Sequence, residues 1–372
     1  MYRTLIMPLR FWGGFANRMP QNLVLDAKPI GRPLSSPTSV LPKASASFAL
    51  ATDNSQDCPL YASRLARQAL HAPDNHVFER VNRLKHFEPV GTKQKQLQHC
   101  AVLILPKMAR YAKLNYMAKI IAFSNHKGGV GKTTACVNVA ACLAENGKRV
   151  LVVDLDAQAN ATSSLGIFDK NPQYSSYDLL CGGVNTSLCI RSITQTGLKT
   201  LKNIAASKNL AGAELELAGV EDREHVLEKA LAPIKDGFDY IFMDCAPSLS
   251  LVTVNALTAA DGVIVPIVCE YFALEGLAQT INTVKLVRKH LNPSLNVLGV
   301  VLAMYDGRSK LAREVRAQVD NLFGDKVFET VVPRNVRLAE APSYGKPINL
   351  YDNKCAGAKA YAALAQEFIQ KI

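Results

Sequence analysis

The segment KGGVGKTT, at residues 127–134, has the composition of a loop that binds phosphate. Its glycines let the backbone turn tightly and bring N–H groups close to phosphate oxygens. Lys132 can then reach the β- and γ-phosphates, and the Thr133 hydroxyl can ligate Mg²⁺. We therefore predict that ATP and Mg²⁺ bind here, with the nucleotide contacted by Lys127, Gly128, Gly129, Val130, Gly131, Lys132, Thr133 and Thr134.

A second lysine makes this loop a variant of the common GxxxxGK[ST] pattern. His126 occupies the position of the first glycine, and Lys127 follows it. A lysine at this position can reach across a dimer interface to the partner's phosphates, where it would act in trans as an arginine finger does. We predict catalytic roles for Lys127 and Lys132; an ordinary solvated surface charge is the alternative for Lys127.

Three aspartates follow two other apolar runs, VLVVD and YIFMD, and complete the expected site. Because both runs read as strands, Asp154, Asp156 and Asp244 should emerge at the carboxyl ends of a sheet, where ligands of open α/β sheets bind. Asp244 is the candidate for holding Mg²⁺ through water. Asp156 is the candidate for orienting or deprotonating the attacking water, and with Thr133 it completes the metal site. Asp154 is expected to have a structural role.

Apolar runs alternate with helical patterns from Met117 onward. Strands are expected at 119–124, 149–154, 240–244, 262–267, 297–303 and 327–332, and helices at 132–146, 221–232, 274–290, 309–322 and 357–371. The strand runs are continuously apolar, as in strands that are buried on both faces of a parallel sheet. We predict an α/β fold: a doubly wound, mostly parallel sheet flanked by helices, as in P-loop nucleotide hydrolases.

Residues 1–116 differ from the rest of the chain in charge and patterning. They hold 16 Lys and Arg against 6 Asp and Glu, and so carry +10 of the formal net charge of +12. We predict a basic, largely irregular N-terminal arm at 1–116, followed by one ATPase domain at 117–372. Three interpretations of the arm stay open: an upstream segment with Met117 as the true start, an organelle transit peptide, and a disordered arm that touches DNA.

Cysteine usage and hydropathy set further limits. The nine cysteines include no CxxC pair, which favours reduced thiols in a cytosolic protein. No run of eighteen apolar residues occurs, so no membrane-spanning helix is predicted. Because the arm holds most of the charge, nucleic-acid affinity in 117–372 would need a local basic patch.

Five segments together resemble the ParA/Soj family of partitioning ATPases, which have a deviant Walker A loop and are related to MinD. They are KGGVGKTT (127–134), DLDAQANATSSLG (154–166), DYIFMDCAPSL (239–249), CEYFALEGLAQ (269–279) and VPRNVRLAEAPSYGKPI (332–348). The resemblance covers essentially all of 117–372. Many relatives have Gln at the position of His126, so we expect His126 to alter the hydrogen bonding of the loop.

This resemblance implies a nucleotide-driven cycle. ATP would drive a sandwich homodimer in which each Lys127 reaches the opposite nucleotide, and the dimer would bind double-stranded DNA without sequence preference. A ParB-like centromere-binding partner would then stimulate hydrolysis and release the DNA, which places the protein in the cytoplasm on the nucleoid. By position, Pro333 and Asn335 match the adenine-binding stretch, and Arg308 and Arg337 match DNA-binding arginines. A surface salt bridge is the alternative for each arginine.

Other functions within the same superfamily make different demands on the sequence. A MinD-like membrane-cycling ATPase would need a C-terminal amphipathic helix rich in Lys or Arg, whereas GAKAYAALAQEFIQKI reads as a core-packing helix. An iron–sulfur carrier would need a cysteine pair, and Cys245 reads instead as a small buried residue. A nucleotide-switched DNA-binding regulator that hardly turns over is a further alternative.

Overall fold

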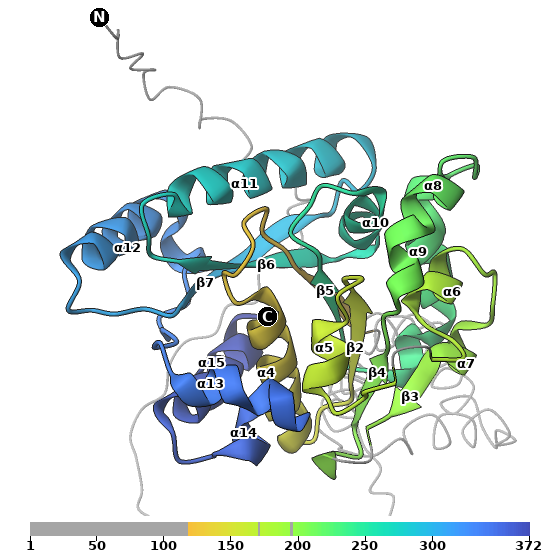
Figure 1. The fold of residues 1–372 in the computed structure, drawn as a ribbon. Helices are drawn as coiled ribbons and strands as arrows, with labels where there is room; N and C mark the ends of the chain where they lie inside the picture. Colours follow the sequence, from red (N-terminus) through yellow and green to blue (C-terminus); the bar gives the residue numbers. More distant parts are fainter. Residues whose placement is uncertain (1–117, 170–171, 194–195) are drawn as a thin grey trace, which may run out of the picture. The chain divides into compact units, whose positions relative to one another are not determined.

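A seven-stranded sheet forms the centre of what this computed structural model describes, which is residues 118–372 without 170–171 and 194–195. The strand order is β3-β4-β2-β5-β1-β6-β7 (Figure 1). The strands are β1 (Lys119–Phe123), β2 (Val150–Leu155), β3 (Ile190–Ser192), β4 (Leu201–Ile204), β5 (Tyr240–Cys245), β6 (Gly262–Val268) and β7 (Asn296–Ala303). Among the strands of the described residues only β3 pairs antiparallel, so the predicted mostly parallel sheet is confirmed. The arm predicted at 1–116 lies outside the described residues.

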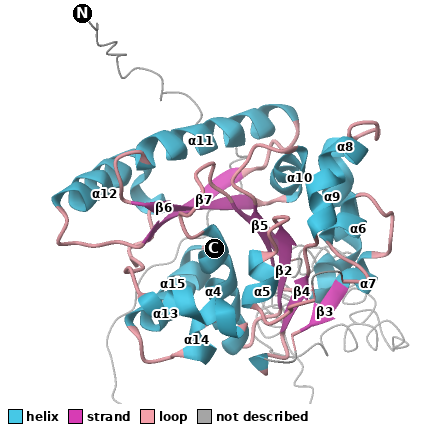
Figure 2. Cartoon of the chain, in the orientation of Figure 1, coloured by secondary structure: helices cyan, strands magenta, loops and turns pink. Residues whose placement is uncertain are grey.

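Helices cover both faces of the sheet (Figure 1, Figure 2). On one face lie α4 (Lys132–Glu145), α5 (Asn160–Ser164), α13 (Val336–Glu340), α14 (Ile348–Tyr351) and α15 (Ala356–Lys371). On the other lie α9 (Val226–Leu231), α10 (Leu251–Ala259), α11 (Ala273–His290) and α12 (Lys310–Phe323). The short helices α6 (Ser176–Leu180), α7 (Thr186–Cys189) and α8 (Ala213–Leu217) lie near the β3 end. This is the doubly wound arrangement.

The sheet packs against its helices through two hydrophobic cores, one on each face. Neighbouring residues of a strand point to opposite faces, so Ile120 of β1 belongs to one core and Ile121 to the other. Both side chains are fully buried. The continuously apolar strand runs are therefore explained by burial on both faces, as the sequence predicted.

The predicted strand at 327–332 is wrong. Val327 and Pro333 make only isolated bridges, to Val300 and Tyr305. The backbone N–H groups of Glu329 and Thr330 donate to the side chain of Glu367 on α15 at 2.7 and 2.9 Å. Phe328 and Val332 donate their N–H groups to β7, at Val300 O and Leu302 O, but the ladder is interrupted between them because the Thr330 N–H is taken by the carboxylate. The sequence also missed β3 and β4, which are short, and α10.

Helix α4 positions the phosphate loop and ends as predicted. It begins at Lys132, directly after Gly131, and its last turn is closed by Gly147. Gly147 has φ +80° and donates its N–H to Ala144 O at 3.0 Å. A left-handed glycine of this kind satisfies the carbonyl groups that a helix end leaves open.

Candidate functional site

The loop between β1 and α4 has the backbone that a phosphate cradle requires. Gly129 and Gly131 have φ angles of +72° and +84°, a region that side chains disfavour. Lys132 begins α4, so the positive end of the helix dipole lies at the loop. Strand, loop and helix therefore follow in the order predicted, although the nucleotide contacts assigned to 127–134 stay predictions.

Lys132 is held inside the loop. Its side chain is buried, with 6% of the residue exposed, and Nζ donates to Lys127 O at 3.0 Å. Burial lowers the pKa of Lys132, and the nearby charge of Asp244 works in the opposite direction. A buried ammonium group needs more compensation than one carbonyl oxygen provides. The phosphates of a nucleotide could supply it for Lys132.

Asp244 lies at the end of β5 beside the loop. In the sheet register it pairs with Phe123, the last residue of β1, and with Asp154 of β2. It is fully buried, and neither of its carboxylate oxygens has a hydrogen bond of good geometry within the described residues, although the Thr133 side chain is near enough to work against the rise of its pKa. Burial, followed by the charge of Asp154, raises its pKa well above the usual range. Such a carboxylate fits a bound cation or its water shell, as a Mg²⁺ site requires.

Asp154 and Asp156 take different environments although they are two residues apart. Asp154 is fully buried, and burial raises its pKa to about 6. Its Oδ1 accepts the Asp156 N–H at 3.1 Å, which supports the predicted structural role. Asp156 is partly exposed, and its Oδ1 accepts the N–H of Gln158 at 2.9 Å. The exposed carboxylate is the one that can meet water.

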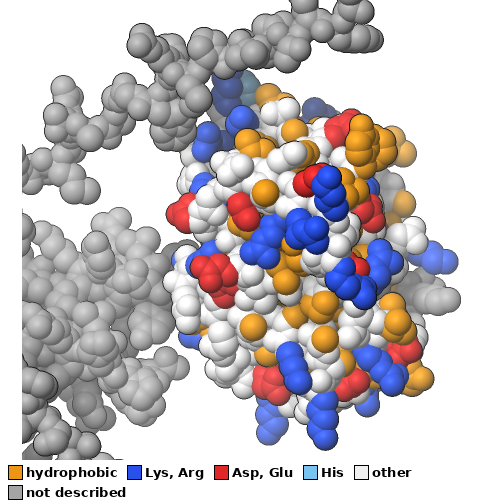
Figure 3. All heavy atoms as spheres, turned by 90° about the vertical axis from the view of Figure 1, so that its left-hand side faces the viewer, with side chains coloured by type: hydrophobic (Ala, Val, Ile, Leu, Met, Phe, Trp, Pro, Cys, Tyr) orange, Lys and Arg blue, Asp and Glu red, His pale blue; other side chains and the backbone are white. Residues whose placement is uncertain are grey.

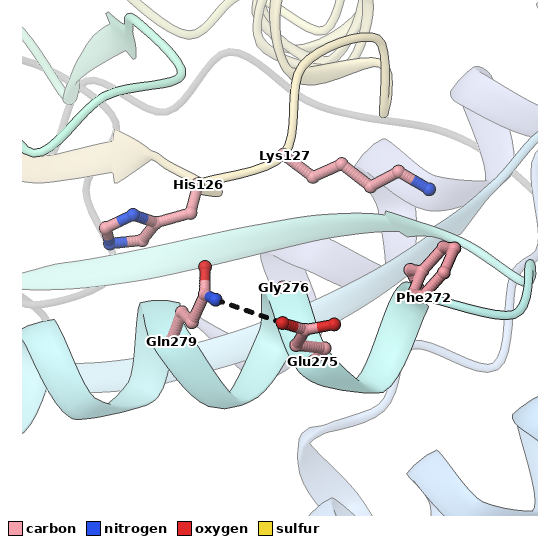
Figure 4. Close-up of a pocket in the computed structure, with 6 residues that line it drawn as sticks. All are labelled: His126, Lys127, Phe272, Glu275, Gly276 and Gln279. Atoms are coloured by element: carbon pink, nitrogen blue, oxygen red, sulfur yellow. Dashed lines mark hydrogen bonds between the residues drawn. The ribbon is translucent and has the colours of Figure 1, made fainter.

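Lys127 points away from the loop, toward the segment between β6 and α11 where Phe272 lies (Figure 4). Its Nζ lies 3.1 Å from Glu270 Oε2, and a third of the side chain is exposed. A hollow of about 220 Å³ beside it is lined by His126, Lys127, Phe272, Glu275, Gly276 and Gln279. The lysine is accessible at the edge of the site, and its role across a dimer stays a prediction.

His126 ties the loop to α11, as expected from its unusual position. Its N–H donates to Thr280 Oγ1 at 3.2 Å, and its Nε2 lies 2.9 Å from Thr283 Oγ1. The next contact runs from the Lys127 N–H to Asn125 Oδ1 at 2.9 Å. The start of the phosphate loop is therefore anchored to α11 through His126.

Known proteins are similar to this chain over 68% of its length. The family model described as an AAA domain matches residues 118–297. The chain is 53% identical over 251 residues to the sporulation initiation inhibitor protein Soj of Bacillus subtilis, covering 68% of this chain and 98% of that protein. The chain belongs to the ParA/Soj family of partitioning ATPases. The chromosome partitioning protein ParA of Myxococcus xanthus is 46% identical over 255 residues, which cover 68% of this chain and 89% of that protein.

Solved structures also resemble this ParA/Soj family member. Cobyrinic acid a,c-diamide synthase from Mycobacterium smegmatis, with bound ADP and magnesium, has a TM-score of 0.59 and 35% identity over 68% of this chain and 95% of that one. The cell division ATPase MinD of Pyrococcus furiosus has a TM-score of 0.55 and 26% identity over 68% and 99%. The family relationship and the fold therefore agree.

The residues expected to contact adenine and DNA in a ParA/Soj protein lie apart from the phosphate loop in sequence. Pro333 makes the isolated bridge to Tyr305, and Asn335 caps α13 by accepting the Arg337 N–H at 2.9 Å. Arg308 is paired with Asp306 through two hydrogen bonds of 2.9 Å, and Arg337 lies 2.8 Å from Glu340. Both arginines thus form the surface ion pairs of the ordinary alternative, and their DNA role stays a prediction.

Sequence reasoning missed several polar residues that build this site. Asn125 is 2% exposed and donates from Nδ2 to Pro266 O at 2.8 Å, while Thr162 is 1% exposed and bonds Asp154. Glu270 pairs with Lys127. Asn125 and Thr162 stand within or next to motif segments, and a search for polar residues in otherwise apolar surroundings could have found them.

Proposed function

We propose that this ParA/Soj family member is an ATP-driven switch for DNA partitioning. It binds MgATP at the phosphate loop, dimerises through the nucleotide, holds double-stranded DNA without sequence preference, and releases it when a ParB-like partner stimulates hydrolysis. The observation that carries the proposal is the gathering of Lys132, Asp156 and Asp244 around one loop, with an Asp244 carboxylate that has no hydrogen bond of good geometry within the described residues.

Each residue of the site has a distinct task. When bound, Mg²⁺ neutralises charge on the β- and γ-phosphates. Thr133, Asp156 and Asp244 would hold it, the last through water, and Lys132 would contact the phosphates directly. Asp156 would orient or deprotonate the attacking water, because its carboxylate is the exposed one of the acid pair.

Apolar side chains at the same edge of the sheet support a dimer. Leu249 follows β5, and Tyr271 and Phe272 follow β6; they are 51%, 77% and 60% exposed. Exposed aromatic residues of this kind are typical of protein interfaces, where their burial is strongly favourable. A second copy docked here would cover them, and Lys127 could exchange Glu270 for the phosphates of the opposite nucleotide.

The DNA part of the proposal concerns the side of the domain shown in Figure 3. Lys and Arg side chains are spread across this view among acidic and apolar ones. The Arg308 side chain is 92% exposed, and the Arg337 side chain is 54% exposed. Exposed ion pairs contribute little, so a DNA phosphate can replace the carboxylate partner of either arginine. Such contacts would be sequence-independent and would place the protein on the nucleoid in the cytoplasm.

The packing of the C-terminal helix supports reversible binding to DNA and argues against reversible binding to a membrane. Tyr361, Leu364 and Phe368 of α15 are each 1% exposed and pack in the core that includes α4. The predicted core-packing helix is thus confirmed, and its apolar face is occupied. Among the described helices, none combines the length and the apolar character needed to cross a bilayer.

The test uses the full chain with ATP, with ADP and without nucleotide. Titration calorimetry with MgATP should give a saturable heat, and phosphate release should be measurable. DNA should be retained on a filter with ATP only, and retention should fall steeply with salt. Equal DNA retention with ATP, with ADP and without nucleotide would refute the switch. ATP-dependent DNA retention without any phosphate release would favour a nucleotide-switched regulator.

A further inference from the structure

The loop that carries Asp156 lacks the usual means of holding its shape. It leads into α5, whose N-cap is Ala159, a residue without a hydrogen-bonding side chain. Ala159 has φ +53°, and this left-handed conformation costs a residue with a Cβ about 1–2 kcal/mol. A short helix with no cap of its own, entered through a strained residue, must be stabilised from elsewhere.

The Asp154 carboxylate supplies this stabilisation from β2. Its Oδ2 accepts the N–H of Thr162, in the first turn of α5, at 2.8 Å and the Thr162 hydroxyl at 2.7 Å. Its Oδ1 accepts the Asp156 N–H at 3.1 Å. One buried carboxylate therefore holds both ends of the loop, and it caps α5 in place of an N-cap side chain.

The Thr162 hydroxyl extends the same network to a third element. While it donates to Asp154, its oxygen accepts the N–H of Ala206, two residues after the end of β4, at 3.0 Å. Thr162 and Ala206 are each 1% exposed and Asp154 is fully buried, so water cannot replace these bonds. Loss of the hydroxyl would leave the Ala206 N–H without its acceptor and would let the Asp154 carboxylate turn.

We propose that Thr162 is a positioning residue for ATP hydrolysis. Its hydroxyl fixes the rotamer of Asp154, Asp154 fixes the backbone of Asp156, and the Asp156 carboxylate is thereby held for the attacking water. The inference rests on the proposed function, because it assumes that Asp156 acts on that water. Displacing such a group by about 1 Å can reduce the rate 100-fold, whereas nucleotide affinity depends on the phosphate loop.

Three variants of the full chain test this proposal. Thr162→Val keeps the shape and the backbone N–H but removes the hydroxyl, whereas Thr162→Ser retains it. Ser164→Ala is the matched control on the same helix, because Ser164 is 6% exposed and its Oγ donates to Asn160 O at 2.7 Å without contacting Asp154. The readouts are kcat and KM for MgATP, and hydrogen exchange of the peptide that covers 155–165 without nucleotide.

We expect Thr162→Val to lower kcat at least tenfold with KM changed less than twofold, and to speed exchange in 155–165. Thr162→Ser and Ser164→Ala should keep kcat within twofold of the parent. A Thr162→Val variant whose kcat and exchange match those of Ser164→Ala would overturn the proposal, as would a rise in KM at unchanged kcat. A parent protein that releases no phosphate would instead refute the proposed function, and exchange would still decide whether the hydroxyl holds the loop.

Discussion

At the residue scale, two buried carboxylates lie side by side in the site, shielded from solvent. Asp154 and Asp244 are register partners on β2 and β5, and both are fully buried. Burying a charge is costly unless it is paired, so each needs its own compensation. Asp154 is compensated by Thr162 and the Asp156 N–H, whereas Asp244 has no hydrogen bond of good geometry within the described residues and is offset by the Thr133 side chain and the Lys132 charge. The difference supports a structural role for Asp154 and a ligand-binding role for Asp244.

Replacing Asp156 by alanine separates hydrolysis from binding. We expect Asp156→Ala to bind MgATP and to dimerise, but to release phosphate at least about 100-fold more slowly, because a positioned general base contributes roughly that factor. Phosphate release and light scattering in the presence of ATP measure the two properties. A variant that remains monomeric with ATP bound would show that Asp156 is needed for dimerisation and not only for chemistry.

At the element scale, two glycines allow α5 to pack against the segment that leads to α14. A Cβ on Gly345 would lie 2.5 Å from the Gly166 Cα and 2.8 Å from Phe168. Gly345 also has φ +60°, which disfavours any other residue. The turn that follows α5 and the turn that precedes α14 thus meet through a contact that leaves no room for a side chain on Gly345.

Gly345→Ala should therefore destabilise the protein more than a substitution that adds strain alone. Gly183 is the matched control, because its φ is +58° and its Cβ would have no neighbour within 4 Å. We expect Gly183→Ala to cost about 1–2 kcal/mol of unfolding free energy. Gly345→Ala should cost about 1–3 kcal/mol more, because of overpacking. Urea unfolding of both variants measures the difference, and equal costs would show that the segment moves aside freely.

At the scale of the whole molecule, charge is distributed unevenly along the chain. Residues 118–372 are near neutral, since residues 1–116 carry +10 of the total +12. Any DNA affinity of the described domain must then depend on where its cations lie and not on its net charge. This makes a paired charge-reversal experiment informative, because two double variants can change the net charge equally at different places.

Arg308→Glu combined with Arg337→Glu should abolish ATP-dependent DNA retention and leave the ATPase rate without DNA within about twofold, because neither arginine belongs to the nucleotide site. Arg223→Glu combined with Lys229→Glu is the control, because it changes the net charge by the same amount at another place. Arg223 lies in the turn before α9, and Lys229 lies within α9. Filter retention at several salt concentrations measures the effect. Equal losses in both double variants would show that only the overall charge matters.

The sequence by itself determined the class of fold, the phosphate loop and the ends of the strands that carry acids. These features are local: KGGVGKTT defines its own backbone, and a continuously apolar run before Asp154 or Asp244 is enough to predict a buried strand. The end of α4 was predictable for the same reason, because the expected helix at 132–146 stops just before Gly147. Periodicity and turn chemistry act over a few residues, so they can be read directly from the chain.

Only the tertiary structure decided which distant residues meet. The bonds of the Asp154 carboxylate with Thr162, and of Thr162 with Ala206, join segments that have no fixed spacing. The apolar run at 327–332 makes only isolated bridges to the sheet because the Glu367 carboxylate, 38 residues from Glu329, takes the N–H groups of Glu329 and Thr330. A partner supplied by another element is set by packing of the whole domain, and no local pattern encodes it.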